Sequence, residues 1–168
     1  MSDVIILMGS PNDRPVVEPC LSLLRELGVS ARMHFGSAHR CPEHVRTIVS
    51  EGEANGTKLF ICAAGGAAHL AGAVAAASAK PVIGIPLAAG ALGGVDALYS
   101  TCNMPPGMPV ATVSVGSWGA TNAAVLAAQI IALVDPAVAQ KVAEYRARQT
   151  AGVIAKDQAL QEEDADQG

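Results

Sequence analysis

A hydroxyl, an imidazole and a guanidinium, those of Ser37, His39 and Arg40, lie within four consecutive residues. An apolar run ends just before them at Phe35 and a helical pattern begins near Glu43, which predicts a loop between a strand and a helix. Ser37 and Arg40 can bind a phosphate at a helix N-terminus, and His39 can exchange protons near neutral pH. The alternative is that Ser37 only caps the helix and that His39 and Arg40 lie on an ordinary solvated loop.

A second candidate loop, Gly9-Ser10-Pro11-Asn12-Asp13, also follows an apolar run. Ser10 and Asn12 offer hydrogen bonds, and the Asp13 carboxylate can accept hydrogen bonds from two hydroxyls of a ribose. Ser, Asn and Asp also form N-caps routinely, and by itself this cluster favours the N-cap interpretation.

The third loop reads AAGGAAHL over residues 63–70. Gly65 and Gly66 allow a backbone to approach a ligand closely, and the surrounding alanines would leave a tight apolar pocket for a small neutral molecule. His69, as a single histidine on an alanine-rich helix, is more often structural than catalytic. This loop is not G-x-G-x-x-G, so a dinucleotide site is poorly supported. Residues 9–13 are not a Walker loop, because no Gly-Lys-Ser/Thr follows them.

These loops are positioned by alternating apolar runs and helical patterns, which predict one three-layer αβα domain. The sheet is expected to be flavodoxin-like, doubly wound and parallel, with about five strands, and an extra C-terminal helix follows it. Strands are expected at residues 3–8, 29–35, 58–63, 81–86 and 109–115, and helices at 16–27, 43–54, 64–79, 95–102, 121–133 and 136–156. Because the carboxyl ends of parallel strands meet at one edge, the three loops are expected to lie together.

The net charge of −4 is concentrated at the C-terminus. Residues 157–168 contain five acidic residues and no Lys or Arg, which leaves 11 basic and 10 acidic residues in residues 1–156. We therefore expect a single catalytic domain over residues 1–156 and a disordered acidic tail over 157–168. A nearly neutral body has no basic surface for nucleic acid, so an anionic ligand must be small and bound locally.

The four cysteines are widely spaced, with no C-x-x-C and no His at metal-site spacing, which indicates free thiols in a reduced, cytoplasmic protein without a metal. Cys41 is a candidate nucleophile beside His39, although a thiol two residues away along a loop need not face the imidazole. No apolar stretch approaches the roughly 20 residues that span a bilayer, so no membrane is expected as a partner.

Two further segments concern contacts with other chains. Residues 121–133 form an almost wholly apolar helix, which predicts burial against another subunit. The proline-rich residues 103–109 are either a rigid lid, a contact with a neighbour or a plain stiff crossover.

Taken together, these segments resemble the N5-carboxyaminoimidazole ribonucleotide mutase family of purine biosynthesis, often called PurE, in its class I branch. The similarity runs from Val4 to about Leu133 and into the terminal helix at residues 145–150. The matching motifs, in chain order, are Met8-Gly9-Ser10-x-x-Asp13, Ser37-Ala38-His39-Arg40-x-Pro42, Ala64-Gly65-Gly66-Ala67-Ala68-His69-Leu70, Leu92-x-Gly94-Val95-Asp96-x-Leu98-Tyr99-Ser100, Met104-Pro105 and Gly119-Ala120-x-Asn122-Ala123.

The family has two branches. One moves a carboxylate from N5 of the substrate to ring carbon C4, and the other carboxylates aminoimidazole ribonucleotide directly with CO2. Arg40 and the Gly65–Leu70 segment resemble the mutases, whereas Glu43-His44-Val45 resembles the carboxylases. The resemblance implies a mutase, with the direct carboxylase as the alternative. A third possibility, a non-catalytic flavodoxin-like module that binds a nucleotide or flavin, is disfavoured because the chain has one Trp and two Tyr to place against a flavin.

The resemblance also implies the roles of individual residues. His39 would be the general acid–base, and no metal, ATP or redox cofactor would be needed. The enzyme would be a cytoplasmic homo-oligomer, typically an octamer. Substrate-binding residues would be Ser10, Asn12, Asp13, Ser37, Ala38, Arg40, Gly65, Gly66, Ala67, His69 and Leu70. Four positions depart from the usual family residues. Asn12 occupies a position where the family usually has Ser, Arg14 one where it commonly has Trp, and Ala88 and Asn103 positions where it usually has Gln. Asn12 can still bind a phosphate, and Arg14 is a candidate for added positive charge at the site.

Overall fold

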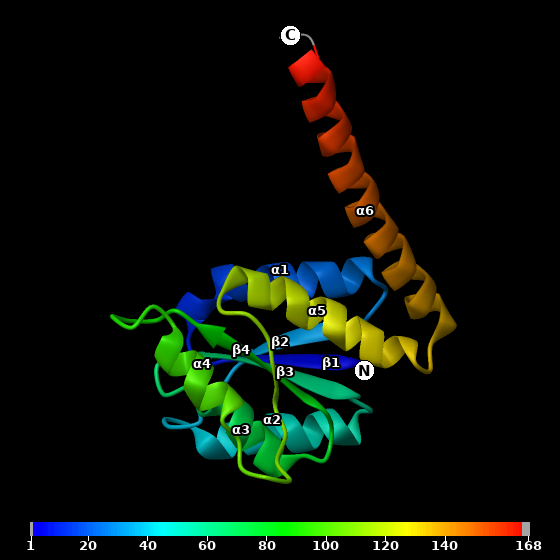
Figure 1. Ribbon diagram of the computed structural model, residues 1–168. Coiled ribbons are helices and arrows are strands. Elements are labelled where there is room, and N and C mark those ends of the chain that lie inside the picture. The colour runs from blue at the N-terminus through cyan, green and yellow to red at the C-terminus, as the bar shows by residue number, and fades with distance from the viewer. Residues whose placement is uncertain (1, 166–168) are drawn as a thin grey trace.

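A five-stranded parallel sheet lies between two layers of helices in the computed structural model, which describes residues 2–165 (Figure 1). Every strand pairing is parallel, and the spatial order is β2-β1-β3-β4-β5. This is the doubly wound order of flavodoxin, so the predicted fold class is confirmed. The strands are β1 (Val4–Met8), β2 (Ala31–Phe35), β3 (Leu59–Gly65), β4 (Val82–Leu87) and β5 (Ala111–Thr112).

The described residues also form six α-helices and one short 3-10 helix, and the helices α5 and α6 follow the last strand. Helices α1 and α5 cover one face of the sheet, and α2, α3 and α4 cover the other (Figure 1). The elements are η1 (Pro11–Asp13), α1 (Arg14–Glu26), α2 (Pro42–Ala54), α3 (Leu70–Ala77), α4 (Val95–Cys102), α5 (Ser117–Ala132) and α6 (Pro136–Ala165).

Strand β1 is apolar along its whole length because both of its faces are buried. Val4, Ile6 and Met8 belong to the core shared with α1 and α5. Ile5 and Leu7 belong to the opposite core, which is shared with α2 and α3. The sheet interior therefore holds the loops at its carboxyl edge on a rigid support.

Two predicted boundaries next to the carboxyl edge are wrong. Helix α3 begins at Leu70 rather than near residue 64, because β3 continues to Gly65 and because Gly66 and Ala68 have positive φ of 62° and 43°. A right-handed helix does not accept that conformation. Strand β5 contains Ala111 and Thr112 rather than residues 109–115. It lies at the edge of the sheet and follows a proline-rich segment, and because prolines have no backbone N–H, that segment offers few donors for strand pairing.

Helix α5 is not buried on every side within one chain. A stripe of small residues, which includes Ala120, Ala123 and Ala127, packs against α1 and the sheet. The side chains of Trp118 and Leu133 are 80% and 83% exposed. The predicted burial of the remaining surface against another subunit stays a prediction.

Helix α6 is longer than its predicted end near Lys156, and it projects away from the body of the molecule (Figure 1). Asp135 accepts backbone hydrogen bonds from Ala137 and Val138 at 3.0 and 3.2 Å and so caps the start of the helix. The helix continues to Ala165 through most of the acidic segment, because that segment contains strong helix formers and neither Gly nor Pro before its end. Residues 157–165, for which the sequence predicts disorder, are helical in this structure, and residues 166–168 lie outside the described residues.

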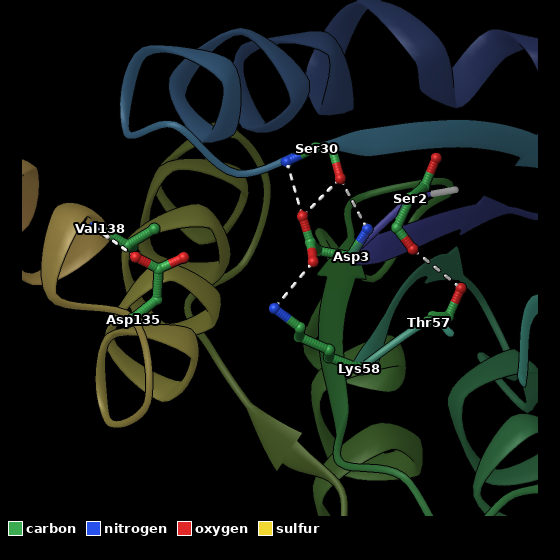
Figure 2. Close-up of polar contacts among 7 residues, drawn as sticks. All are labelled: Ser2, Asp3, Ser30, Thr57, Lys58, Asp135 and Val138. Atoms are coloured by element: carbon green, nitrogen blue, oxygen red, sulfur yellow. Dashed lines mark hydrogen bonds and ion pairs between the residues drawn. The ribbon is translucent and has the colours of Figure 1, made fainter. Parts of the chain in front are cut away.

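The edge of the sheet opposite to the three loops is fastened by Asp3 (Figure 2). Ser30 donates from its backbone and its hydroxyl to the Asp3 carboxylate, and Lys58 Nζ lies 2.9 Å from Asp3 Oδ1. Partial burial acts to raise the pKa of Asp3, but the bonds from Ser30 and Lys58 outweigh it, so the pKa lies below its ordinary value. These contacts join the starts of β1, β2 and β3.

None of the helices within residues 2–165 has both the length and the apolar character to span a membrane.

Candidate active site

The loops that follow β1, β2, β3 and β4 surround one cavity of about 420 Å³. It lies at the carboxyl edge of the sheet, where the chain order reverses between β1 and β3, the usual ligand position in this fold. The lining residues are Gly9, Ser10, Asp13, Ser37, Ala38, His39, Arg40, Ala64, Gly65, Gly66, Ala68, His69, Leu70 and Ala89.

Ten of the predicted site residues line this cavity, and Asn12 and Ala67 do not. Both of these residues are exposed, and the backbone N–H of Asn12 donates to Ser10 Oγ at 3.2 Å. Sequence reasoning missed Gly9, Ala64, Ala68 and Ala89 as lining residues. The signal for Ala89 was its position two residues after the end of β4, at the same edge as the three loops.

Arg40 connects the loop after β2 to the loop after β1. Its Nη2 donates to the Gly9 carbonyl oxygen at 2.9 Å, and its backbone N–H donates to Ser37 Oγ at 3.2 Å. Helix α2 begins at Pro42 with Cys41 as the N-cap residue, so Ser37 does not cap it. Ser37 instead holds Arg40 in place, which favours the anion-binding interpretation.

Cys41 contacts the backbone of its own loop and does not line the cavity. Its Sγ accepts a hydrogen bond from the Ser37 backbone N–H at 3.2 Å, and the thiol is not among the groups that line the cavity. The interpretation of Cys41 as a nucleophile has no geometric support.

Asp13 and Ser10 form the polar wall on the β1 side. Ser10 is the N-cap residue of η1, as the N-cap interpretation predicts, and its hydroxyl hydrogen is still free to donate to a ligand. Burial raises the pKa of Asp13, and a backbone hydrogen bond from Ser10 and the charge of Arg40 oppose this shift without cancelling it. Burial therefore disfavours the ionised form of this carboxyl group, and a ligand hydroxyl that donates a hydrogen bond to it would offset that effect.

The wall formed by the loop after β3 is tight. A Cβ atom on Gly65 would lie 2.4 Å from the Cβ of Ala89, so the loops after β3 and β4 touch only because residue 65 is glycine. Ala68 is buried with a φ of 43°, a strained conformation for alanine. The Ser100 hydroxyl lies 3.3 Å from the Gly66 carbonyl oxygen and contacts this loop from α4.

The imidazoles of His39 and His69 are in direct contact. Nε2 of His39 lies 2.7 Å from Nδ1 of His69, and the two rings meet edge to face with an interplanar angle of 75°. His69 immediately precedes α3, while His39 comes from the loop after β2. The expectation that His69 is structural alone is therefore incomplete, because it binds the residue expected to exchange protons.

The charged groups that line the cavity are Asp13 and Arg40. Arg14 forms an ion pair with Glu18 at 3.0 Å along α1 and does not line the cavity, so it does not supply the added charge expected from the sequence.

Within residues 2–165, no three His, Cys, Asp or Glu side chains are grouped closely enough to hold a metal ion.

Residues 103–109 do not cover the cavity within one chain. Met104 packs against Gly72 of α3, and its Sδ would lie 3.3 Å from a Cβ placed there. Ala88 and Asn103, two of the departures from the family pattern, are also absent from the lining. In a single chain the segment is a stiff crossover between α4 and β5.

Comparisons with known proteins agree on one family. The family model for AIR carboxylase matches residues 3–152. Among curated proteins, the N5-carboxyaminoimidazole ribonucleotide mutase of Methanocaldococcus jannaschii is 44% identical over 159 residues, which covers 95% of this chain and 98% of the relative. The mutase of the same name from Thermotoga maritima is 41% identical over 162 residues, with 96% and 94% covered. The Escherichia coli mutase is 42% identical over 151 residues, with 90% and 89% covered.

Solved structures give the same result. A crystal structure of Treponema denticola PurE matches with a TM-score of 0.82 and 35% sequence identity, and the match covers 94% of this chain and 97% of that one. The similarity to these proteins in both sequence and fold therefore extends over most of the chain.

Proposed function

Because this chain belongs to the AIR carboxylase family, we propose that it works as an N5-carboxyaminoimidazole ribonucleotide mutase in purine biosynthesis. The observation that carries the proposal is the cavity itself, where two imidazoles, a guanidinium, two hydroxyls and a carboxyl group face a wall of glycine and alanine. We assign the activity to the α/β unit of residues 1–156.

The polar side of the cavity suits the phosphoribosyl portion of the substrate. Arg40 and the hydroxyls of Ser10 and Ser37 bind the phosphate, and Asp13 accepts hydrogen bonds from the ribose hydroxyls. The loop that includes Gly65, Gly66 and Leu70 then lies against the reacting ring. This division is supported by the positions of these groups in one cavity.

The reaction needs one proton delivered and one removed. The bond between N5 and the carboxylate carbon breaks and N5 receives a proton, which leaves CO2 and aminoimidazole ribonucleotide. C4, an enamine-like nucleophile, then attacks the CO2, and loss of the C4 proton restores the aromatic ring. His39 gives the first proton and takes the second. The alanine and glycine wall holds CO2 beside C4, which is a gain in proximity.

This chemistry transfers no electrons and consumes no nucleoside triphosphate, so we assign the enzyme no cofactor. A flavin-binding module is not supported, because none of the described residues that line the cavity is Phe, Tyr or Trp. A homo-oligomer, an octamer by family resemblance, is supported by apolar side chains that one chain leaves exposed, such as Trp118, Leu133 and Val153. Light scattering on the purified protein measures the number of subunits.

Replacement of His39 tests the proposal. His39→Asn should abolish turnover and leave the circular dichroism spectrum and the oligomer size unchanged. His44→Asn is the matched control, since His44 is exposed on α2 outside the cavity, and it should keep full activity. Substantial activity in His39→Asn would remove His39 from its role.

A further inference from the structure

We infer that Ser100 of α4 is a positioning residue, whose hydroxyl holds the loop after β3 in the strained conformation that closes the apolar wall of the cavity. Neither Ser100 nor any other residue of α4 is among those that line the cavity, so this role acts from behind the wall. The inference rests on the proposed function, because it gives the wall a task in that reaction.

The loop after β3 keeps a backbone conformation that its sequence does not favour. Ala68 has a φ of 43°, and this buried residue lines the cavity. Glycine adopts such a φ without strain, whereas the Cβ of alanine makes it costly. A strained conformation of this kind persists only where the surrounding contacts hold it in place. The contacts of the loop therefore decide whether the Ala68 methyl group stays in the wall.

Two contacts from other elements reach this loop beside the strained residue. The close approach of Gly65 to Ala89 is a packing contact. The hydroxyl of Ser100 supplies the polar contact, because it lies 3.3 Å from the Gly66 carbonyl oxygen and 2.6 Å from the Asp96 carbonyl oxygen. A serine hydroxyl has one hydrogen, which these two acceptors share. Ser100 thus joins the strained turn to the backbone of α4.

Helix α4 is itself fixed to the sheet, next to Ser100. Thr101 is buried, and a Cβ placed on Gly84 of β4 would lie 2.3 Å from its Cγ2 atom, so the helix and the strand are in close contact. Thr101 Oγ1 also donates to the Ala97 carbonyl oxygen at 2.7 Å, which holds the side chain in that position. The hydroxyl of Ser100 is therefore fixed relative to the sheet that supports the cavity.

The consequence concerns the CO2 formed during the proposed reaction. The wall must keep CO2 in place after its bond to N5 breaks and until its bond to C4 forms. Without the Ser100 hydroxyl, the turn relaxes toward negative φ at Ala68, which moves the methyl group and widens the wall. CO2 then leaves before C4 attacks it, and the aminoimidazole ribonucleotide that remains reacts with CO2 from solution instead.

Isotope exchange during turnover measures this loss of CO2. The enzyme receives unlabelled N5-carboxyaminoimidazole ribonucleotide in ¹³C-bicarbonate buffer with carbonic anhydrase, and mass spectrometry gives the labelled fraction of the product early in the reaction. We expect Ser100→Ala to raise this fraction about threefold or more, with KM within about twofold of its original value, because the variant loses one neutral hydrogen bond that does not touch the substrate.

Two further variants are matched to Ser100→Ala. Ser100→Thr keeps a hydroxyl at the same position and should keep the labelled fraction close to that of the unmodified enzyme. Ser50→Ala removes a hydroxyl that bonds to the Thr47 carbonyl oxygen within α2 and does not line the cavity, so it should change neither the labelled fraction nor KM. A rise in Ser100→Thr as large as that in Ser100→Ala would mean that the hydroxyl is not what holds the loop.

Hydrogen exchange tests the positioning without any turnover. The Ala68 N–H donates to the Gly65 carbonyl oxygen at 3.2 Å across the turn, so its exchange reports on the conformation of the loop. In Ser100→Ala, peptides that contain this loop should exchange about threefold faster, as measured by mass spectrometry, because the turn loses one of its external contacts. Ser50→Ala should leave this exchange unchanged.

The two measurements separate this inference from the proposed function. Unchanged exchange in Ser100→Ala contradicts the inference, whatever reaction the enzyme catalyses. Faster exchange with an unchanged labelled fraction also overturns it, since the loop would then move without releasing CO2. If exchange is faster but the unmodified enzyme forms no product from N5-carboxyaminoimidazole ribonucleotide, the proposed function fails and the role of Ser100 in retaining CO2 fails with it.

Discussion

The guanidinium of Arg40 donates to the carbonyl oxygen of Gly9 across 2.9 Å, although the two residues are 31 positions apart in the chain. The contact joins the loops after β2 and β1 at the edge of the cavity. A single side chain therefore carries a positive charge at the cavity and connects two of the loops that line it.

Arg40→Ala should raise KM by about 10- to 100-fold, because a charge-assisted hydrogen bond to an anion contributes on the order of 1.5–3 kcal/mol. The value of kcat should change much less. Steady-state kinetics with N5-carboxyaminoimidazole ribonucleotide measures both constants. Arg14→Ala is the matched control, since Arg14 pairs with Glu18 outside the cavity, and it should leave both constants unchanged. An unchanged KM with a reduced kcat in Arg40→Ala would disprove the phosphate assignment.

Gly65→Ala should lower the free energy of unfolding by about 1–3 kcal/mol and reduce activity, because the added methyl group forces the loops after β3 and β4 apart. The new Cβ would lie 2.4 Å from Ala89 Cβ and 3.1 Å from the Leu87 carbonyl oxygen. Urea denaturation and the mutase assay measure the two effects.

Gly152→Ala is the control for that substitution, because nothing lies within 4 Å of a Cβ placed at this position in α6. Alanine is the better helix former, so this variant should gain about 0.5–1 kcal/mol. Equal stability of the two variants would show that the loops are not in close contact.

Asp13→Asn should stabilise the apo protein at pH 7 and raise KM. The pKa of Asp13 is raised in the fold, mainly by burial, so the folded state binds this proton more tightly than the unfolded state does. The stability that Asp13 contributes is thus present below its unfolded pKa and is lost as pH rises through the raised value. Because the side chain is only partly buried, the gain in Asp13→Asn at pH 7 should be below about 1 kcal/mol.

Urea midpoints at pH 7 and at pH 4 measure this effect, and the difference between the two proteins should shrink at the lower pH. A less stable Asn variant at pH 7 would mean that the ionised carboxylate makes a stabilising contact in the apo protein.

The sheet was predictable because its central strands are apolar on both faces. Runs such as Val4–Met8 are short, continuous and bounded by turn residues. Because ligands bind at the carboxyl ends of parallel strands, the loops that contain Ser10, His39 and Gly65 could then be predicted to lie together, and all three residues line the cavity. Strand β5 was less predictable, since an edge strand of two residues has little apolar pattern.

The details of the site depend on contacts that local patterns do not contain. His39 and His69 are 30 residues apart, and nothing in either loop alone indicates that their rings meet. Asn12 has the right chemistry, but it is exposed on η1 and is not among the residues that line the cavity. Ala89 has no polar group to attract notice, and it matters because it touches the wall at Gly65.

The central claim is tested most directly by an assay for carboxyaminoimidazole ribonucleotide without ATP. One reaction receives N5-carboxyaminoimidazole ribonucleotide, and the other receives aminoimidazole ribonucleotide with bicarbonate at a modest concentration. We predict fast product formation from the first reaction only. Comparable or faster product formation from the second would show a direct carboxylase, and Arg40 would then not distinguish the two branches of the family.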